Sequence, residues 1–225
     1  MIRLPGLAFA LALAATIAAR PALADDDAQL WLSYAASGQL KGELAGYFDT
    51  NARFYDNAGH LGHFQLRGGL GWRFAPGAIV GAGYSYVRTE SLSGAVAHEH
   101  RIFEQASYPI AGIGKARLVG RTRLEHRMFE GSDPVAHRLR QQVRLNIPLH
   151  GPKGLQGIVH SEVYFLLNRP INRAPTGFNQ IRTFAGLGIP LADTLTLEAG
   201  YLNQAIAVGD KPMNHAFSLG LVTRF

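Results

Sequence analysis

Arginine and glutamate recur at alternate positions along several stretches of the chain. The longest series lies in the middle of the sequence and contains Arg117, Arg121, Arg123, Glu125, Arg127, Arg138, Arg140 and Arg144. Planar guanidinium groups bind carboxylates and other oxyanions in a bidentate manner. Two interpretations follow: a set of ion pairs that fills the interior of the fold, or a cationic pore or pocket for anions.

Histidines are the second set of residues with reactive chemistry. His98 and His100 are two residues apart, His126 lies in the arginine-rich series, and His160 precedes Ser161. Adjacent residues of a strand point to opposite faces, so His160 and Ser161 cannot form a nucleophile–base pair. His98 and His100 have the spacing of two metal ligands but lack a third. We expect no metal, cofactor or catalytic residue, and we keep His98, His100 and His126 as secondary candidates.

Alternation of apolar and polar residues predicts the elements that must position these side chains. In residues 215–225 the apolar side chains share one parity, namely Phe217, Leu219, Leu221 and Phe225. Alternation with a period of two predicts a β-strand with one apolar face. A barrel strand that crosses a bilayer needs about 9–11 residues, with apolar side chains outside and polar or small ones inside.

Eleven segments show this alternation: 28–36, 41–54, 62–74, 77–90, 98–109, 114–128, 135–148, 154–168, 179–190, 194–206 and 213–225. Short turns and longer polar loops alternate between them, as in outer-membrane barrels. The predicted fold is all-β, an antiparallel transmembrane barrel of 10–12 strands. Because bacterial barrels have even strand numbers, we expect ten or twelve. Glu104 shares parity with Ile102, which indicates a bulge or a shifted register in segment 98–109.

The lumen side of the predicted strands carries most of the charge. The predicted network comprises Arg53, Arg67, Arg101, Arg117, Arg121, Arg123, Glu125, Arg127, Arg138, Arg140, Arg144, Glu162, Arg182 and Glu198. An isolated charge in a narrow barrel is poorly solvated, so we expect these arginines to pair with carboxylates. Eight aromatic residues lie towards strand ends or on outward parity, and we expect them to form a girdle at the membrane interface: Tyr34, Phe48, Tyr84, Tyr86, Tyr108, Tyr164, Phe165 and Tyr201.

Residues 1–24 have the features of a secretory signal peptide. Arg3 precedes the apolar run 7–19, and the segment ends in Ala22-Leu23-Ala24. Arg20 and Pro21 interrupt the run before it reaches the roughly 20 residues of a spanning helix. We therefore expect cleavage after Ala24 and a barrel formed by residues 25–225.

The composition excludes several classes of protein. The chain has 225 residues, of which 17% are charged and none is cysteine. This rules out disulfide scaffolds, thiol nucleophiles and cysteine-based zinc sites. Lysine and arginine total 22 against 16 acidic residues, and 18 of the 22 are arginine. Because these arginines point inward by parity and the chain is exported, we expect no nucleic-acid partner.

A family resemblance runs over nearly the whole predicted mature chain. It is carried by Trp31, Ala52-Arg53-Phe54 with Asp56-Asn57, the segments 66–71, 81–84, 99–105 and 121–127, Glu162 with Phe165 and Asn168, the segment 179–182, Gly200-Tyr201 and Asn214-His215. The chain resembles the domain-of-unknown-function 2490 family of uncharacterised Gram-negative outer-membrane β-barrel proteins, with Phe103 where we expect tryptophan. The resemblance implies an outer-membrane barrel, but the family supplies no activity, ligand or catalytic residue that could be carried over. A last strand ending in phenylalanine, here Phe225, resembles the signal that the barrel assembly machinery recognises.

These observations favour a non-enzymatic protein of the outer membrane. We expect either a narrow anion-preferring channel or a structural barrel with a lumen filled by arginine and glutamate. The expected partners are outer-membrane lipid and lipopolysaccharide, the barrel assembly machinery and a small anionic solute. Two alternatives remain: an outer-membrane hydrolase that acts on lipid or lipopolysaccharide, and a soluble periplasmic β-sandwich that binds a ligand.

Overall fold

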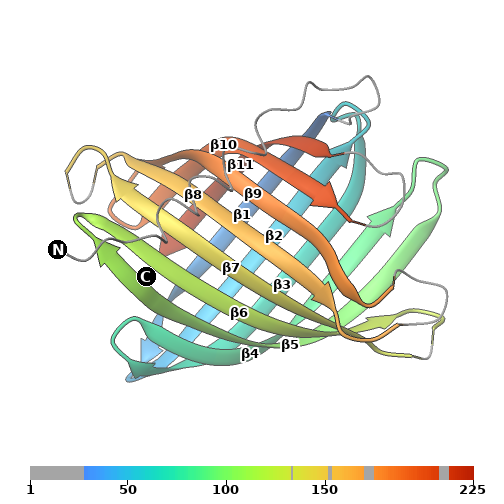
Figure 1. The fold of residues 1–225 in the computed structure, drawn as a ribbon, viewed down its shortest axis with the longest axis horizontal. Coiled ribbons are helices and arrows are strands. Elements are labelled where there is room, and N and C mark those ends of the chain that lie inside the picture. Colours follow the sequence, from blue (N-terminus) through green and yellow to red (C-terminus); the bar gives the residue numbers. More distant parts are fainter. Residues whose placement is uncertain (1–27, 133, 152–153, 170–174, 208–212) are drawn as a thin grey trace.

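The alternating segments form eleven strands that close into a barrel (Figure 1). The computed structural model describes residues 28–132, 134–151, 154–169, 175–207 and 213–225, and contains no helix within them. The expected signal peptide, residues 1–24, lies outside the described residues. The strands are β1 (Ala28–Lys41), β2 (Leu44–Tyr55), β3 (His60–Ala75), β4 (Ala78–Glu90), β5 (Val96–Ile113), β6 (Ala116–Phe129), β7 (Ala136–Pro148), β8 (Gln156–Leu166), β9 (Gly177–Pro190), β10 (Leu195–Ile206) and β11 (Asn214–Arg224).

The strand number departs from the even value that we expected. Each strand pairs antiparallel with its neighbour in sequence, but an odd number makes the first and last strands run in the same direction. The barrel therefore closes through a parallel ladder between β1 and β11, from Ala28 opposite His215 to Ser37 opposite Arg224. The prediction of ten or twelve strands was wrong, and so was that of a fully antiparallel barrel, although eleven alternating segments were visible.

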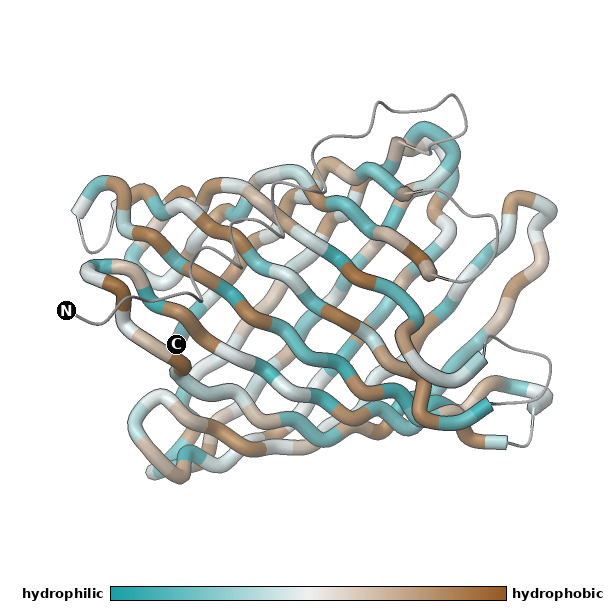
Figure 2. Tube along the Cα trace, in the orientation of Figure 1, coloured by the Kyte–Doolittle hydropathy of each residue, from teal (hydrophilic) through white to brown (hydrophobic). Residues whose placement is uncertain are grey.

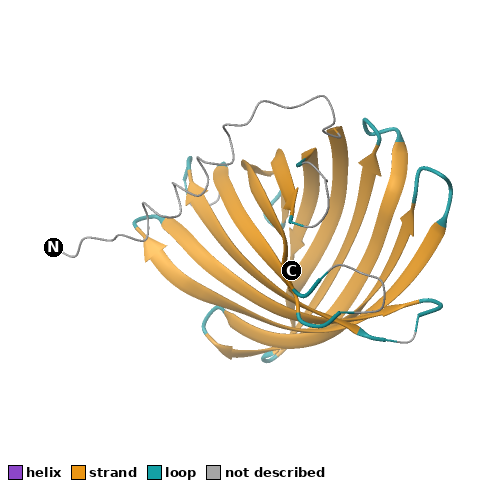
Figure 3. Cartoon of the chain, turned by 45° about the vertical axis from the view of Figure 1, so that its right-hand side comes forward, coloured by secondary structure: helices purple, strands orange, loops and turns teal. Residues whose placement is uncertain are grey.

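The closed topology also excludes the two-sheet sandwich, because every described strand has a partner on both sides. Loops and turns lie at the two ends of the barrel (Figure 3). One end, here called the turn end, carries the connections 42–43, 76–77, 114–115, 149–155 and 191–194, and the last strand finishes there. The other end, the loop end, carries 56–59, 91–95, 130–135, 167–176 and 207–213, and β1 starts there.

Hydropathy alternates along the strands, as Figure 2 shows, so the barrel has two chemically different faces. Large apolar side chains lie exposed on the outer face, among them Leu70, Trp72 and Phe217. No helix in the described part of the chain is long and apolar enough to span a membrane.

Two expectations about side-chain direction were wrong. Tyr164 does not belong to an outer girdle, because it shares the inward parity of Glu162 and is only 1% exposed. Glu104 does not mark a bulge, because the ladder between β4 and β5 is continuous there and Glu104 simply faces outward. The irregularity in β5 lies further along, between Pro109 and Ala111.

Inward-facing glycines make room for aromatic rings in the lumen. A Cβ atom on Gly83 of β4 would lie 2.7 Å from Cζ of Phe103, and one on Gly200 of β10 would lie 2.8 Å from Cζ of Phe184. Both rings are almost completely buried. Side chains thus occupy the middle of the lumen, as in other small barrels.

Candidate functional site

Two buried carboxylates organise the centre of the lumen. Glu125 on β6 accepts hydrogen bonds from Arg138 Nε and Nη2, at 2.8 and 2.5 Å, and from Arg140 Nη1 at 2.6 Å. Arg140 on β7 also donates to both oxygens of Glu162 on β8, at 3.1 and 2.8 Å. Tyr164 donates to Glu162 at 2.7 Å. Glu125 is 1% exposed, so its charge is balanced by arginines and not by solvent.

A second cluster forms around Glu99 on β5, nearer the loop end. Arg101 donates to both carboxylate oxygens at 2.7 Å, and Arg127 on β6 donates to the same oxygens at 2.5 and 3.1 Å. Two arginines therefore share one carboxylate. Arg67 on β3 pairs more loosely with Asp49 on β2, at 3.4 Å.

Two further ion pairs join strands that are not neighbours. Arg121 on β6 donates to Glu162 on β8 at 3.0 Å and so passes over β7. Arg144 on β7 donates to both oxygens of Glu198 on β10, at 3.1 and 2.5 Å. Because β8 and β9 separate these two strands, the second pair passes over both of them on the lumen side of the wall.

Arg123 does not make the bidentate carboxylate pair that its position suggested. Its Nε and Nη2 donate to the Gln105 side-chain oxygen at 3.0 and 2.6 Å, and the nearest Glu125 oxygen lies 4.0 Å from Nη1. Its guanidinium stacks over Phe103, with the carbon Cζ 4.7 Å from the ring centroid. Nη1 is buried and has no hydrogen-bond partner in the described part of the chain.

Arg53 and Arg182 contact an aromatic ring rather than a carboxylate. Cζ of Arg53 lies 3.9 Å from the centroid of Trp31, and Cζ of Arg182 lies 5.0 Å from the same ring. Arg53 Nε donates to Asn51 at 2.5 Å. Within the described residues neither arginine has a carboxylate within 4.0 Å, so both depart from the expected pairing.

Apolar side chains fill the lumen beside these charges. A buried cluster joins strands from both sides of the parallel seam and contains Trp31, Ile158, Phe184, Leu202 and Ala216. On the other side of the lumen, Tyr47 of β2 meets Phe103 of β5 with ring centroids 6.1 Å apart. Apolar and ionic contacts together cross the barrel at several levels.

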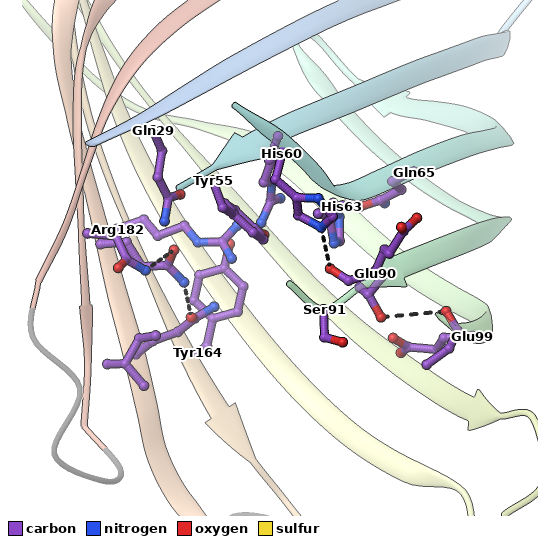
Figure 4. A pocket seen from close by; sticks show the side chains of 18 of the residues that line it. Gln29, Tyr55, His60, His63, Gln65, Glu90, Ser91, Glu99, Tyr164 and Arg182 are labelled. Carbon is purple, nitrogen blue, oxygen red and sulfur yellow. Dashed lines mark hydrogen bonds between the residues drawn. The ribbon is translucent and has the colours of Figure 1, made fainter. Parts of the chain in front are cut away.

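The loop-end half of the lumen remains open as a cavity of about 1030 Å³. The side chains labelled in Figure 4, including Tyr55, His63, Tyr164 and Arg182, surround it. The cavity reaches from the loop-end connections down to Arg140. Here it is called the vestibule.

The other candidates lie away from this cavity. Arg117 is exposed near the turn end of β6. Phe225 extends the ladder to β1, because its N–H donates to the Ser37 carbonyl at 3.2 Å and its carbonyl accepts from Gln39 at 3.3 Å. Its side chain is exposed.

The three candidate histidines all face outward. His98 and His100 form hydrogen bonds with the hydroxyls of Tyr86 and Tyr84, at 2.6 and 2.5 Å. His126 lies between Glu104 and His137, at 3.1 and 2.8 Å. Among the described residues, no three histidine or carboxylate side chains are arranged to hold a metal ion.

Sequence reasoning missed two residues of the lumen. It assigned Tyr164 to the girdle and overlooked Gln105 as the partner of Arg123, although both lie at inward parity. Parity was the signal that could have found both residues. The stacking of two arginines on Trp31 involves β1, β2 and β9, and no local pattern indicates which distant strands meet.

Comparison with known proteins relates the chain to proteins without an assigned role. The family model described as "Protein of unknown function (DUF2490)" matches residues 28–214. An uncharacterized protein of Methylorubrum extorquens is 30% identical over 220 residues, which cover 96% of this chain and 95% of the relative. The siderophore receptor PirA of Pseudomonas aeruginosa matches 81% of this chain with 19% identity and a TM-score of 0.38. The chain spans only 34% of that receptor, and a similarity this low supports no inference.

Proposed function

The chain belongs to the DUF2490 family, and we propose that it is a non-enzymatic outer-membrane barrel whose lumen is closed to solute flow. Its interior forms a blind vestibule, open at the loop end and sealed toward the turn end. The observation that carries this proposal is the set of contacts across the lumen, above all the Arg144–Glu198 pair.

The outer face supports a location in lipid. Leu70, Trp72 and Phe217 are each more than half exposed, and such side chains recur around the barrel. Water-soluble proteins rarely expose so much apolar surface, whereas lipid-facing strands require it. Halfway along β4 and β10, Tyr84 and Tyr201 form hydrogen bonds with His100 and His215 on the same outer face.

The different lengths of the connections at the two ends support one orientation of the barrel in the membrane. In bacterial outer-membrane barrels the short turns face the periplasm and the longer loops face outward. The turn end, which holds Phe225, would therefore be periplasmic. The vestibule would face the exterior.

The interior supports closure rather than conduction. Glu125, Glu162, Phe103, Phe184 and Tyr164 are each at most 5% exposed, so these side chains pack against one another and against the wall. A conducting pore needs a hydrated path along which ions bind weakly. Here Glu125 and Glu162 are each bound by two arginines, which favours a structural plug over an anion channel.

The hydrolase alternative has one observation in its favour, the Glu104–His126–His137 chain on the outer face. A carboxylate–imidazole pair resembles part of a nucleophile-activating system. In the described part of the chain, however, His126 has no hydrogen bond to a serine or threonine hydroxyl. The arrangement lacks the nucleophile that covalent ester hydrolysis needs.

Membrane fractionation and solute permeability test the two parts of this proposal. We expect the protein in the outer-membrane fraction, with a heat-dependent shift in gel mobility. We also expect proteoliposomes that contain it to be no more permeable to small sugars and anions than empty vesicles. Recovery in the osmotic-shock fluid would contradict the location, and rapid anion entry would contradict the closed lumen.

A further inference from the structure

The charges that line the vestibule are only partly neutralised. Seven arginines line it: Arg53, Arg67, Arg101, Arg127, Arg138, Arg140 and Arg182. Five of them have carboxylate partners, which are Asp49, Glu99, Glu125 and Glu162. Arg53 and Arg182 are the exceptions in the described part of the chain. Within the described residues, the vestibule is therefore lined by two arginines that have no carboxylate partner.

These two arginines lie close together. Both guanidinium carbons are within 5.0 Å of the centroid of Trp31. Their mutual repulsion raises the free energy of the empty cavity, and burial away from water adds to this cost. An anion between them would relieve the repulsion and supply the missing hydrogen-bond acceptors.

Two buried nitrogen atoms without hydrogen-bond partners point to the same conclusion. Arg182 Nε and His63 Nε2 are buried and have no hydrogen-bond partner in the described part of the chain. His63 is 8% exposed and lines the vestibule beside Arg53. Buried polar groups are normally paired, so these two nitrogens are available to a ligand in the cavity.

We propose that Arg53 and Arg182, stacked on Trp31, form a binding site for a small oxyanion that carries at least two negative charges. Phosphate, a phosphate ester or a di- or tricarboxylate has this chemistry. Guanidinium forks bind phosphate and carboxylate in the same bidentate geometry. The cavity volume of about 1030 Å³ is at the upper end for small-molecule pockets and accommodates an organic anion.

The site depends on the vestibule being accessible, as in the proposed function, but it does not depend on the lumen being closed. Binding and permeability are separate measurements, so either proposal can fail without the other. The ligand enters as a free solute from the loop end. An anionic lipid headgroup is the competing source of the same chemistry.

Tryptophan fluorescence provides a direct test, because the chain has only two tryptophans. Trp72 is exposed on the outer face, so Trp72→Phe leaves Trp31, on which Arg53 and Arg182 stack, as the only tryptophan. The refolded protein in non-ionic detergent is titrated with sodium phosphate and with sodium citrate, against sodium chloride at equal ionic strength. We expect a saturable change in Trp31 emission with at least one of the two oxyanions and none with chloride.

Variants of the two arginines identify the site. Arg53→Gln and Arg182→Gln, each in the Trp72→Phe background, should weaken binding about ten-fold or more, because each removes a charge-assisted contact. Arg117→Gln makes the same change in charge at the opposite end of the lumen and should bind as the parent does. If Arg53→Gln fails to refold, Arg53→Lys is the alternative variant, because it keeps the positive charge and removes the bidentate guanidinium group. It should still weaken binding measurably.

Three results would overturn the proposal. The first is an emission that responds to neither oxyanion beyond the chloride control. The second is equal affinity in the Arg53, Arg182 and Arg117 variants. The third is an emission change that requires vesicles containing lipid A and does not occur with free anions, which would assign the site to a lipid headgroup.

Discussion

Arg144 on β7 and Glu198 on β10 form a bidentate ion pair inside the lumen, with Nη2 2.5 Å from Oε1 and Nη1 3.1 Å from Oε2. The two strands are separated by β8 and β9, so this contact bridges two intervening strands on one side of the lumen. It lies closer to the turn end than the Glu125 and Glu162 cluster does. Ion pairs thereby lie at more than one level of the lumen.

Replacing one partner of this ion pair should lower the free energy of unfolding more than replacing both partners. Glu198→Leu leaves the Arg144 guanidinium without its acceptor in a site where both side chains are about one-fifth exposed. We expect a loss of about 1–3 kcal/mol in the free energy of unfolding. The double variant Arg144→Leu with Glu198→Leu should regain most of that loss, because no charge is then left unpaired. Urea denaturation in lipid vesicles measures both values, and additive effects of the two substitutions would contradict the pairing.

Glu125 should be the most sensitive carboxylate in the barrel. It accepts from Arg138 and Arg140 and is 1% exposed, so Glu125→Gln leaves buried arginines unbalanced. We expect a loss of about 3–5 kcal/mol in the free energy of unfolding. The matched control is Glu104→Gln on the outer face, which should change it by about 0.5 kcal/mol or less. Similar losses in the two variants would show that the lumen does not bury Glu125.

Arg123 behaves differently from the other central arginines. It binds the neutral amide of Gln105 and stacks on Phe103, and Glu125 keeps two other arginines. Arg123→Met keeps much of the stacked volume and removes a buried charge, so we expect a smaller loss than for Glu125→Gln. Thermal unfolding followed by the gel-mobility shift compares the two variants. A loss in Arg123→Met as large as that in Glu125→Gln would mean that Arg123 is the main counter-charge of Glu125.

Phe225 is expected to act in assembly rather than in stability. Its backbone continues the seam with β1, while its side chain is exposed and packs little. Phe225→Ala should lower the amount of folded protein in the outer membrane several-fold. Phe217→Ala removes an equally exposed ring from the same strand and should have a weaker effect. Wild-type levels of the Phe225 variant, measured by immunoblot of membrane fractions, would refute the role of the terminal residue.

The direction of side chains was readable from the sequence because a strand has a period of two. Inward placement of Arg121, Glu125 and Arg140 follows from parity alone, and the observed strands overlap all eleven predicted segments. The largest error in a boundary is at β1, which was expected to end at residue 36 and continues to Lys41. The expected gap between segments 28–36 and 41–54 is absent because β1 and β2 stay paired as far as Lys41 and Leu44.

The way in which the barrel closes, and which charged side chains pair inside it, could not be predicted from the sequence. The parallel seam between β1 and β11 depends on how the whole sheet closes, and an even-number rule drawn from other barrels gave the wrong count. Arg144 and Glu198 are 54 positions apart in the sequence. Periodicity carries no information about which distant strands come into contact inside the barrel. The same limit hid the position of Arg53 and Arg182 on one tryptophan.

Conductance in a planar lipid bilayer tests the closed lumen most directly. The purified, refolded protein should be electrically silent, whereas a variant with Ile158→Ala, Phe184→Ala and Leu202→Ala in the apolar cluster should show stepwise conductance. Conductance of the variant would show that the refolded barrel inserts into the bilayer, which a silent recording of the unmodified protein cannot show. Reproducible anion-selective steps from the unmodified protein would contradict the account and make the arginine-lined lumen a channel.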